Sequence, residues 1–84
     1  MSNKLLYFAS LREALGVSSE VVTLPDGVTD IAQLRAYLAA RGEPWQVLVA
    51  TKNLRAAVNQ TLVGSETGIQ DGDEIAFFPP VTGG

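Results

Sequence analysis

The residues best suited to chemistry lie at the C-terminus, where residues 77–84 read Phe-Phe-Pro-Pro-Val-Thr-Gly-Gly. Pro79 and Pro80 lack a backbone N–H and have a fixed φ, so they end a strand and favour an extended exit. Gly83 and Gly84 have no side chain, which lets the last peptide units enter a narrow channel. The pattern predicts that the Gly84 carboxylate is offered to another enzyme. Such a carboxylate reacts after activation, usually as an acyl-adenylate made from ATP, from which sulfur, a thiol or an amine displaces AMP.

The composition excludes most of the chemistry that the chain could perform alone. Cysteine and histidine are both absent, which excludes thiol nucleophiles, disulfides, Ser-His-Asp triads and Cys/His zinc sites. We therefore expect no metal site and no catalysis by the isolated chain. Residues 71–73 read Asp-Gly-Asp but lack the further spaced ligands that calcium requires, so they predict a turn. Without cysteine, any sulfur that the chain carries must be attached to Gly84, as a thiocarboxylate.

Length and charge restrict the domain organisation and the partners. A chain of 84 residues forms one domain, which we expect to span residues 1–80 and to end in a flexible Gly-Gly tail at 81–84. The formal net charge of −3 argues against a nucleic-acid partner. No apolar stretch is long enough for a membrane span. The apolar run at residues 5–9 is too short for a signal peptide and has no basic leader before it, so we expect a cytoplasmic protein. Residues 56–84 hold four acidic and no basic residues, which predicts either a solvated rim or docking to a basic partner.

Apolar periodicity and turn residues predict the elements that position the tail. A strand at residues 5–9 precedes a short helix at 10–15, for which Ser10 begins a capping box. A second strand at 20–24 leads to the main helix, which begins with a second capping box, from Asp30 to Gln33, and ends near Arg41. An apolar stripe of Ile31, Leu34 and Leu38 lies along this helix. The remaining predicted strands are residues 45–51, 54–58, 61–63 and 74–79.

The order of these elements predicts the fold. One main helix that crosses one face of a mixed sheet is the β-grasp, or ubiquitin-like, arrangement of the α+β class. We expect a sheet of about five strands, with the main helix across one face and the short helix after the first strand.

The period of two along the strands predicts which residues face a partner. If Ile75 and Phe77 meet the main helix, Phe78 lies on the open face. A lysine of the same parity on the first strand places Phe8 on that face as well. Phe8 and Phe78 would then form an aromatic patch beside the tail, with Leu62 as a further member. The alternative is that one of the two phenylalanines fills the edge of the core.

Two further side chains are Arg12, which has two possible roles, and Trp45, which is expected to be structural. Arg12 lies near the start of the short helix, where a cation is slightly unfavourable against the helix dipole. It therefore either faces a partner carboxylate or is solvated. Trp45 is expected at the edge of the core, with no functional role.

Four segments together resemble a known family over nearly the whole chain. They are residues 8–13, 57–60, 71–74 and 77–84, of which the last is the most specific. The chain is similar to the small subunit of molybdopterin synthase, the sulfur carrier of that enzyme. The resemblance implies that a ubiquitin-activating-like adenylyltransferase uses ATP to adenylate Gly84, and that an upstream sulfurtransferase system converts it to a thiocarboxylate. It also implies that no cofactor is bound permanently.

The resemblance further implies a role for the tail and for three apolar positions. The tail is expected to insert into the large synthase subunit and to give its sulfur to cyclic pyranopterin monophosphate. Two carriers in turn would build the dithiolene of molybdopterin. The residues that thread the partner are Pro80, Val81, Thr82 and Gly83, and the hydrophobic contacts are Phe8, Leu62 and Phe78.

Other functions stay open on the sequence alone. A protein modifier would use the same activation but would end with Gly84 in an isopeptide bond to a target lysine. A non-covalent binding module of the same fold would leave the tail idle, so that loss of Gly84 would cost no binding. Sulfur carriers of the thiamine and tRNA-thiolation pathways share the activation step.

Overall fold

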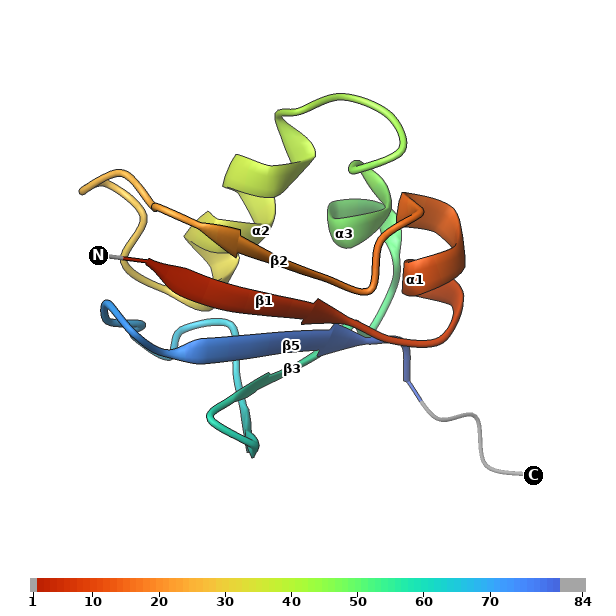
Figure 1. The fold of residues 1–84 in the computed structure, drawn as a ribbon. Coiled ribbons are helices and arrows are strands. Elements are labelled where there is room, and N and C mark those ends of the chain that lie inside the picture. Colours follow the sequence, from red (N-terminus) through yellow and green to blue (C-terminus); the bar gives the residue numbers. More distant parts are fainter. Residues whose placement is uncertain (1, 81–84) are drawn as a thin grey trace.

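The computed structural model describes residues 2–80, which form one mixed sheet with helices on one side (Figure 1). The strands are β1 (Asn3–Tyr7), β2 (Ser19–Val22), β3 (Arg55–Val58), β4 (Thr61–Val63) and β5 (Glu74–Phe78). The helices are α1 (Ser10–Leu15), α2 (Ile31–Ala39) and α3 (Val47–Ala50). The strand order is β2-β1-β5-β3-β4, with β1 and β5 parallel and the other neighbours antiparallel. This confirms the predicted β-grasp arrangement. Within residues 2–80, no helix has the length and apolar character needed to cross a membrane.

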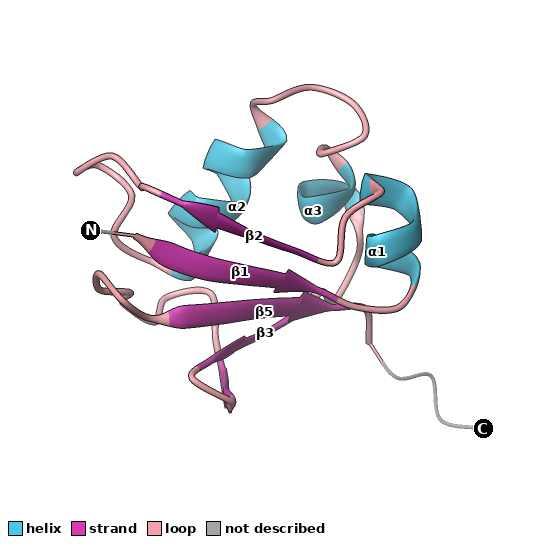
Figure 2. Ribbon diagram, in the orientation of Figure 1, coloured by secondary structure: helices cyan, strands magenta, loops and turns pink. Residues whose placement is uncertain are grey.

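The hydrophobic core lies between the sheet and the helices, which Figure 2 shows together above the strands. The predicted stripe of α2 is buried, and so are alternate residues of the two central strands. Burying one such side chain contributes roughly 1.5–3 kcal/mol of transfer free energy, so this layer holds β5, and with it the start of the tail, in place. The buried side chains of the layer are Leu5, Tyr7, Ile31, Leu34, Leu38, Ile75 and Phe77.

Of the two predicted helix caps, the structure has the one at α2 and lacks the one at α1. At α2 the Asp30 carboxylate accepts a hydrogen bond from the backbone N–H of Gln33 at 2.8 Å, as expected. Gln33 does not complete the box, because its side chain accepts from the N–H of Thr29 instead. At α1 the predicted capping box was wrong: Ser10 is already helical, the preceding Ala9 has a φ of 54°, and no side chain caps the helix.

The prediction of a strand at residues 45–51 was also wrong. The segment forms turns and α3, and it buries Leu48 against the core. Local hydrogen bonds replace a sheet ladder: the N–H of Val47 donates to the carbonyl of Pro44, and that of Leu48 donates to Trp45. A short run of apolar residues fits a buried strand and a buried helical turn equally well, so periodicity did not distinguish them. The other predicted strands are present, with ends shifted by at most two residues.

The Asp-Gly-Asp segment forms a turn, as predicted. Gly72 has a φ of 89°, which only glycine adopts without cost. The Asp73 carboxylate accepts hydrogen bonds from the N–H of Gln70 at 2.9 Å and from the side-chain amide of Asn59 at 3.0 Å. This carboxylate therefore closes the turn before β5 and links it to Asn59.

A cluster of polar and aromatic side chains joins the end of α2 to β1 and β2. The Tyr7 hydroxyl donates to Glu20 at 2.8 Å, and Arg41 donates twice to the same carboxylate, at 2.9 and 3.0 Å. The Arg41 guanidinium lies 4.3 Å from the centroid of Trp45, whose ring meets Tyr7 edge-on at 5.5 Å. Burial, helped by the Glu20 hydrogen bond, raises the pKa of Tyr7. Burial works to raise the pKa of Glu20 too, but the hydrogen bonds from Arg41 and Tyr7 leave it below its usual value.

Candidate functional site

The candidate site is built around the end of β5, where the chain leaves the sheet. This strand lies between β1 and β3, so backbone ladders hold it on both sides up to the exit. Pro79 and Pro80 follow Phe78, and the strand ends before them as expected. The predicted tail at 81–84 lies outside the described residues, and with it the roles assigned to Val81, Thr82, Gly83 and Gly84.

Two phenylalanines lie on adjacent strands at this exit. The register pairs Tyr7 of β1 with Phe77 of β5, and both face the core. The N–H of Phe8 donates to the carbonyl of Phe77 at 3.2 Å, which continues the ladder by one residue. Alternation therefore directs Phe8 and Phe78 to the open face of the sheet. Phe8 is 46% exposed and Phe78 is half-buried, so Phe8 is not a core residue.

An apolar row on the same face connects this pair with Leu62. Leu62 of β4 is 63% exposed and is two strands away from β5. Between β5 and Leu62, the register places short or half-buried apolar side chains, so the surface there is apolar and has no projecting side chain. Together with the phenylalanines they form what we call the open-face patch, which consists of Leu6, Phe8, Ala57, Leu62, Ala76 and Phe78. Exposed apolar surface of this kind marks interaction sites.

Phe8, Leu62 and Phe78 were predicted from the sequence, whereas the row of side chains between them was not. The signal was present, because Leu6 and Ala76 have the same strand parity as Phe8 and Phe78. Which strands are neighbours, however, is not encoded in the parity of any one strand. A partner role for Phe8, Leu62 and Phe78 stays a prediction.

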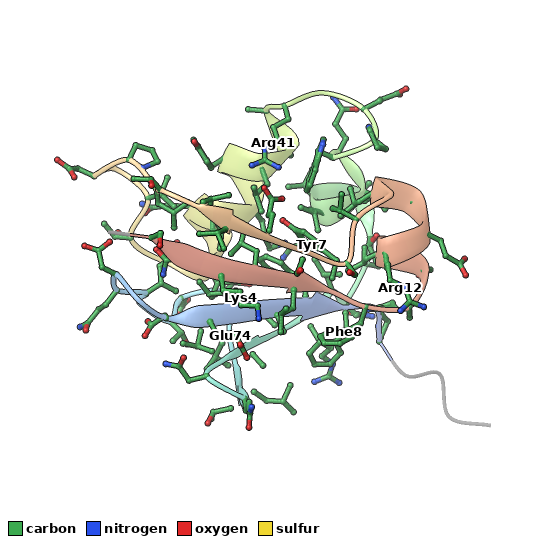
Figure 3. The ribbon with its side chains drawn as sticks, in the orientation of Figure 1. Lys4, Tyr7, Phe8, Arg12, Arg41 and Glu74 are labelled. Atoms are coloured by element: carbon green, nitrogen blue, oxygen red, sulfur yellow. The ribbon has the colours of Figure 1, made fainter. Side chains whose placement is uncertain are left out.

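Two arginines border the patch at the tail end of the sheet. Arg12 is exposed on α1, and Figure 3 shows it with Phe8 at the end of the sheet from which the tail leaves. Arg55 lies directly opposite Phe78 in the β3–β5 ladder and is also exposed. Within residues 2–80, neither arginine belongs to an ion pair. Both interpretations of Arg12 stay open, whereas Arg55 is a border residue that the sequence analysis did not single out.

Comparison with known proteins identifies the family. Residues 5–84 match the ThiS family, so the match runs through the Gly-Gly end of the chain. The chain belongs to the ThiS family. It is 43% identical over 79 residues to the molybdopterin synthase sulfur carrier subunit of Haemophilus influenzae, covering 94% of this chain and 95% of the relative. It is 35% identical over 94 residues to small archaeal modifier protein 3 of Haloferax volcanii, covering 100% of both.

Solved structures of other proteins have the same fold as this ThiS-family chain. Small archaeal modifier protein 1 of Haloferax volcanii superposes with a TM-score of 0.76 at 22% identity, covering 95% of this chain and 98% of that one. A complex of subunits 1 and 2 of molybdopterin-converting factor from Helicobacter pylori matches with a TM-score of 0.67 at 26% identity, covering 100% of both chains. The ThiS-family fold is thus found both in a modifier and in a two-subunit complex.

Proposed function

We propose that the chain is the sulfur carrier subunit of a molybdopterin synthase, and that sulfur is carried on the carboxyl group of Gly84. Family membership and the H. influenzae relative support the carrier role. The absence of cysteine supports the C-terminal carboxyl group as the site, because no side-chain thiol can hold the sulfur.

The observation that carries this proposal is the open-face patch at the exit of the tail. Four residues follow Pro80, and fully extended they reach at most about 14 Å. A partner that receives Gly84 must therefore contact the surface near the end of β5. That surface carries Phe8 and Phe78, which can bury apolar area against the partner while the tail enters its active site.

The proposed chemistry needs an activating enzyme and an acceptor enzyme. In the adenylyltransferase, the Gly84 carboxylate attacks the α-phosphorus of ATP, which releases pyrophosphate and leaves an acyl-adenylate. Sulfide-level sulfur, delivered by the sulfurtransferase as hydrosulfide, then displaces AMP and leaves the thiocarboxylate. In the large synthase subunit, this thiocarboxylate gives its sulfur to cyclic pyranopterin monophosphate. The chain itself supplies docking and carriage rather than a catalytic group.

The test is the covalent state of Gly84 after reaction with ATP, sulfide and the adenylyltransferase. Exchange of oxygen for sulfur adds about sixteen mass units, the same as oxidation of Met1, so the C-terminus must be fragmented to locate the change. A thiol alkylating reagent gives a second readout. Because the chain has no cysteine, alkylation confined to its C-terminal fragment reports the thiocarboxylate.

The matched control is the same chain ending at Gly83. It keeps every described residue and still ends in glycine, but its carboxylate is one residue short. We expect mass gain and alkylation of the full chain and much less of the control. A full chain that stays unmodified, beside an adenylyltransferase shown to be active, would refute the sulfur-carrier proposal.

A second candidate is a protein modifier, favoured by the similarity to small archaeal modifier protein 3. Activation is the same, but a target lysine would displace AMP and form an isopeptide bond. Since no lysine or arginine follows Arg55, trypsin would leave residues 56–84 on the target lysine. Detection of that branched peptide in cells would support the modifier function, and its absence beside abundant thiocarboxylate would reject it.

A further inference from the structure

Arg55 of β3 lies on the open face of the sheet, in the row that crosses the strands at the tail exit. The β3–β5 register pairs it with Phe78, and directly paired residues of antiparallel strands point to the same face. Phe8 continues this row on β1, since the β1–β5 ladder pairs Tyr7 with Phe77 one residue earlier. The row at the exit is therefore Phe8, Phe78 and Arg55, and it ends in a cation rather than in a third apolar side chain.

The place of Arg55 in the sheet means that a docked partner must cover it. Strand β3 lies between β5, which carries Phe78, and β4, which carries Leu62. A surface that contacts Phe78 and Leu62 at once therefore passes over Arg55. This arginine is exposed in the free chain, so its guanidinium loses water only when the partner binds. A cation that is desolvated in this way needs a counter-charge, because a buried charge without a partner is strongly unfavourable.

The described part of the chain gives Arg55 no such counter-charge. Within residues 2–80, Arg55 belongs to no ion pair. Among the strand residues on the open face, the acidic one is Glu74, which is paired with Lys4. Glu74 and Phe78 are the first and last residues of β5, about 13 Å apart along the strand. The Asp-Gly-Asp turn precedes Glu74 and lies at the same far end, so the acidic C-terminal third does not make the tail exit acidic among the described residues.

We propose that Arg55 forms an ion pair with a carboxylate of the large synthase subunit, within the area where that partner covers Phe78 and Leu62. The proposal rests on the proposed function for the identity of the partner. An Asp or Glu side chain fits better than a backbone carbonyl, because it offers two oxygens to the planar guanidinium and neutralises its charge. Arg55 is then a specificity residue, since a partner with a neutral or basic residue at this point leaves the cation buried and unpaired.

The first test compares the affinities of charge variants for the large subunit. Arg55→Gln should raise the dissociation constant roughly tenfold, because a charge-assisted contact is lost, and Arg55→Glu should raise it further. Lys4→Gln is the matched control: it removes the same charge from an exposed residue of the same face, at the end away from the tail. It should change the dissociation constant less than twofold. Equal effects of Arg55→Gln and Lys4→Gln would indicate general charge attraction and would overturn the proposal.

The second test identifies the carboxylate by zero-length cross-linking. Arg55→Lys places a primary amine at the proposed contact, and a carbodiimide joins such an amine to a touching carboxylate as an amide, taking up the water that is lost. The natural chain has two lysines, Lys4 and Lys52, so a new cross-link at residue 55 is readily assigned by mass spectrometry after proteolysis. We expect it to join residue 55 to an Asp or Glu of the large subunit. Cross-links at Lys4 and Lys52 alone would overturn the proposal.

The other possible counter-ion is the chain's own C-terminal carboxylate, which lies outside the described residues. Carbodiimide treatment of the Arg55→Lys chain without the partner distinguishes it, because an internal cross-link between residue 55 and Gly84 would overturn the assignment to a partner.

The role of Arg55 and the proposed function fail in different ways. A wild-type chain with no affinity for the large subunit would overturn both. A wild-type chain that binds and forms the thiocarboxylate on Gly84, beside an Arg55→Gln chain that binds equally well, would overturn the role of Arg55 alone.

Discussion

Phe8→Ala should weaken binding to the large synthase subunit without unfolding the chain. Phe8 is 46% exposed, and a phenylalanine side chain buries about 200 Å² in total. Covering the exposed part removes about 90 Å² from water, which at about 25 cal/mol per Å² corresponds to about 2.3 kcal/mol. Since alanine keeps the β-carbon, the expected loss is about 2 kcal/mol, or roughly a 30-fold higher dissociation constant.

Calorimetric titration of the large subunit with wild-type and variant chains measures this loss. Val21→Ala is the matched control, because Val21 is also an exposed apolar residue of the sheet, at 68%, but lies on the edge strand β2, away from the tail. It should change the dissociation constant less than twofold. Thermal unfolding of each chain, measured separately, shows whether a change in affinity arises from binding or from stability.

Two results would refute the reasoning. A Phe8→Ala chain that binds normally would mean that the open-face patch is not the docking surface. A chain that binds poorly and also unfolds well below the wild-type temperature would mean that Phe8 acts through the core, despite its exposure.

Three further predictions test the core, the polar cluster and the tail. Leu34→Ala, at a fully buried position, should lower the free energy of unfolding by about 2–5 kcal/mol in urea titrations. Glu20 has a lowered pKa when folded, so its stabilisation is present at neutral pH and lost as the pH falls below its ordinary value of 4.5. Urea titrations across pH should therefore show Glu20→Gln less stable than wild type at neutral pH, with the gap narrowing in acid. A chain ending at Gly83 should unfold at the wild-type temperature, because every described residue is kept, yet lose sulfur transfer in an assay with the large subunit.

The sequence predicted the fold because its periodic signals agree with its tertiary contacts. The stripe of α2 and the alternation of β5 each have one apolar face, and each buries that face. The final strand ends where two prolines forbid a ladder. Here the local preferences and the global fold require the same arrangement, which is why simple periods were enough.

Other features depend on contacts that no local pattern contains. The apolar pattern of residues 45–51 suits either a strand or a helical turn. Which of the two forms depends on the elements that pack against the segment. Helix α3 contacts α2, from which Arg35 donates to Leu48. The pocket between α2 and β3 is likewise lined by Ile31, Leu54 and Val63, which come from three distant segments. No spacing in the sequence predicts that these side chains meet.

Adjacent residues at the end of the sheet divide between the core and the proposed docking surface. The rings of Tyr7 and Phe77 stack in the core at 6.4 Å, and one residue further Phe8 and Phe78 lie on the opposite face. A slip of β5 by one residue would exchange these sets, so the buried pair also fixes where the surface pair and the tail emerge. Loss of the Phe77 ring should therefore damage both stability and binding, whereas loss of the Phe8 ring should damage binding alone. Under the proposed function the tail must reach two enzymes in turn, and a register that is set by buried side chains keeps its exit in the same place for both.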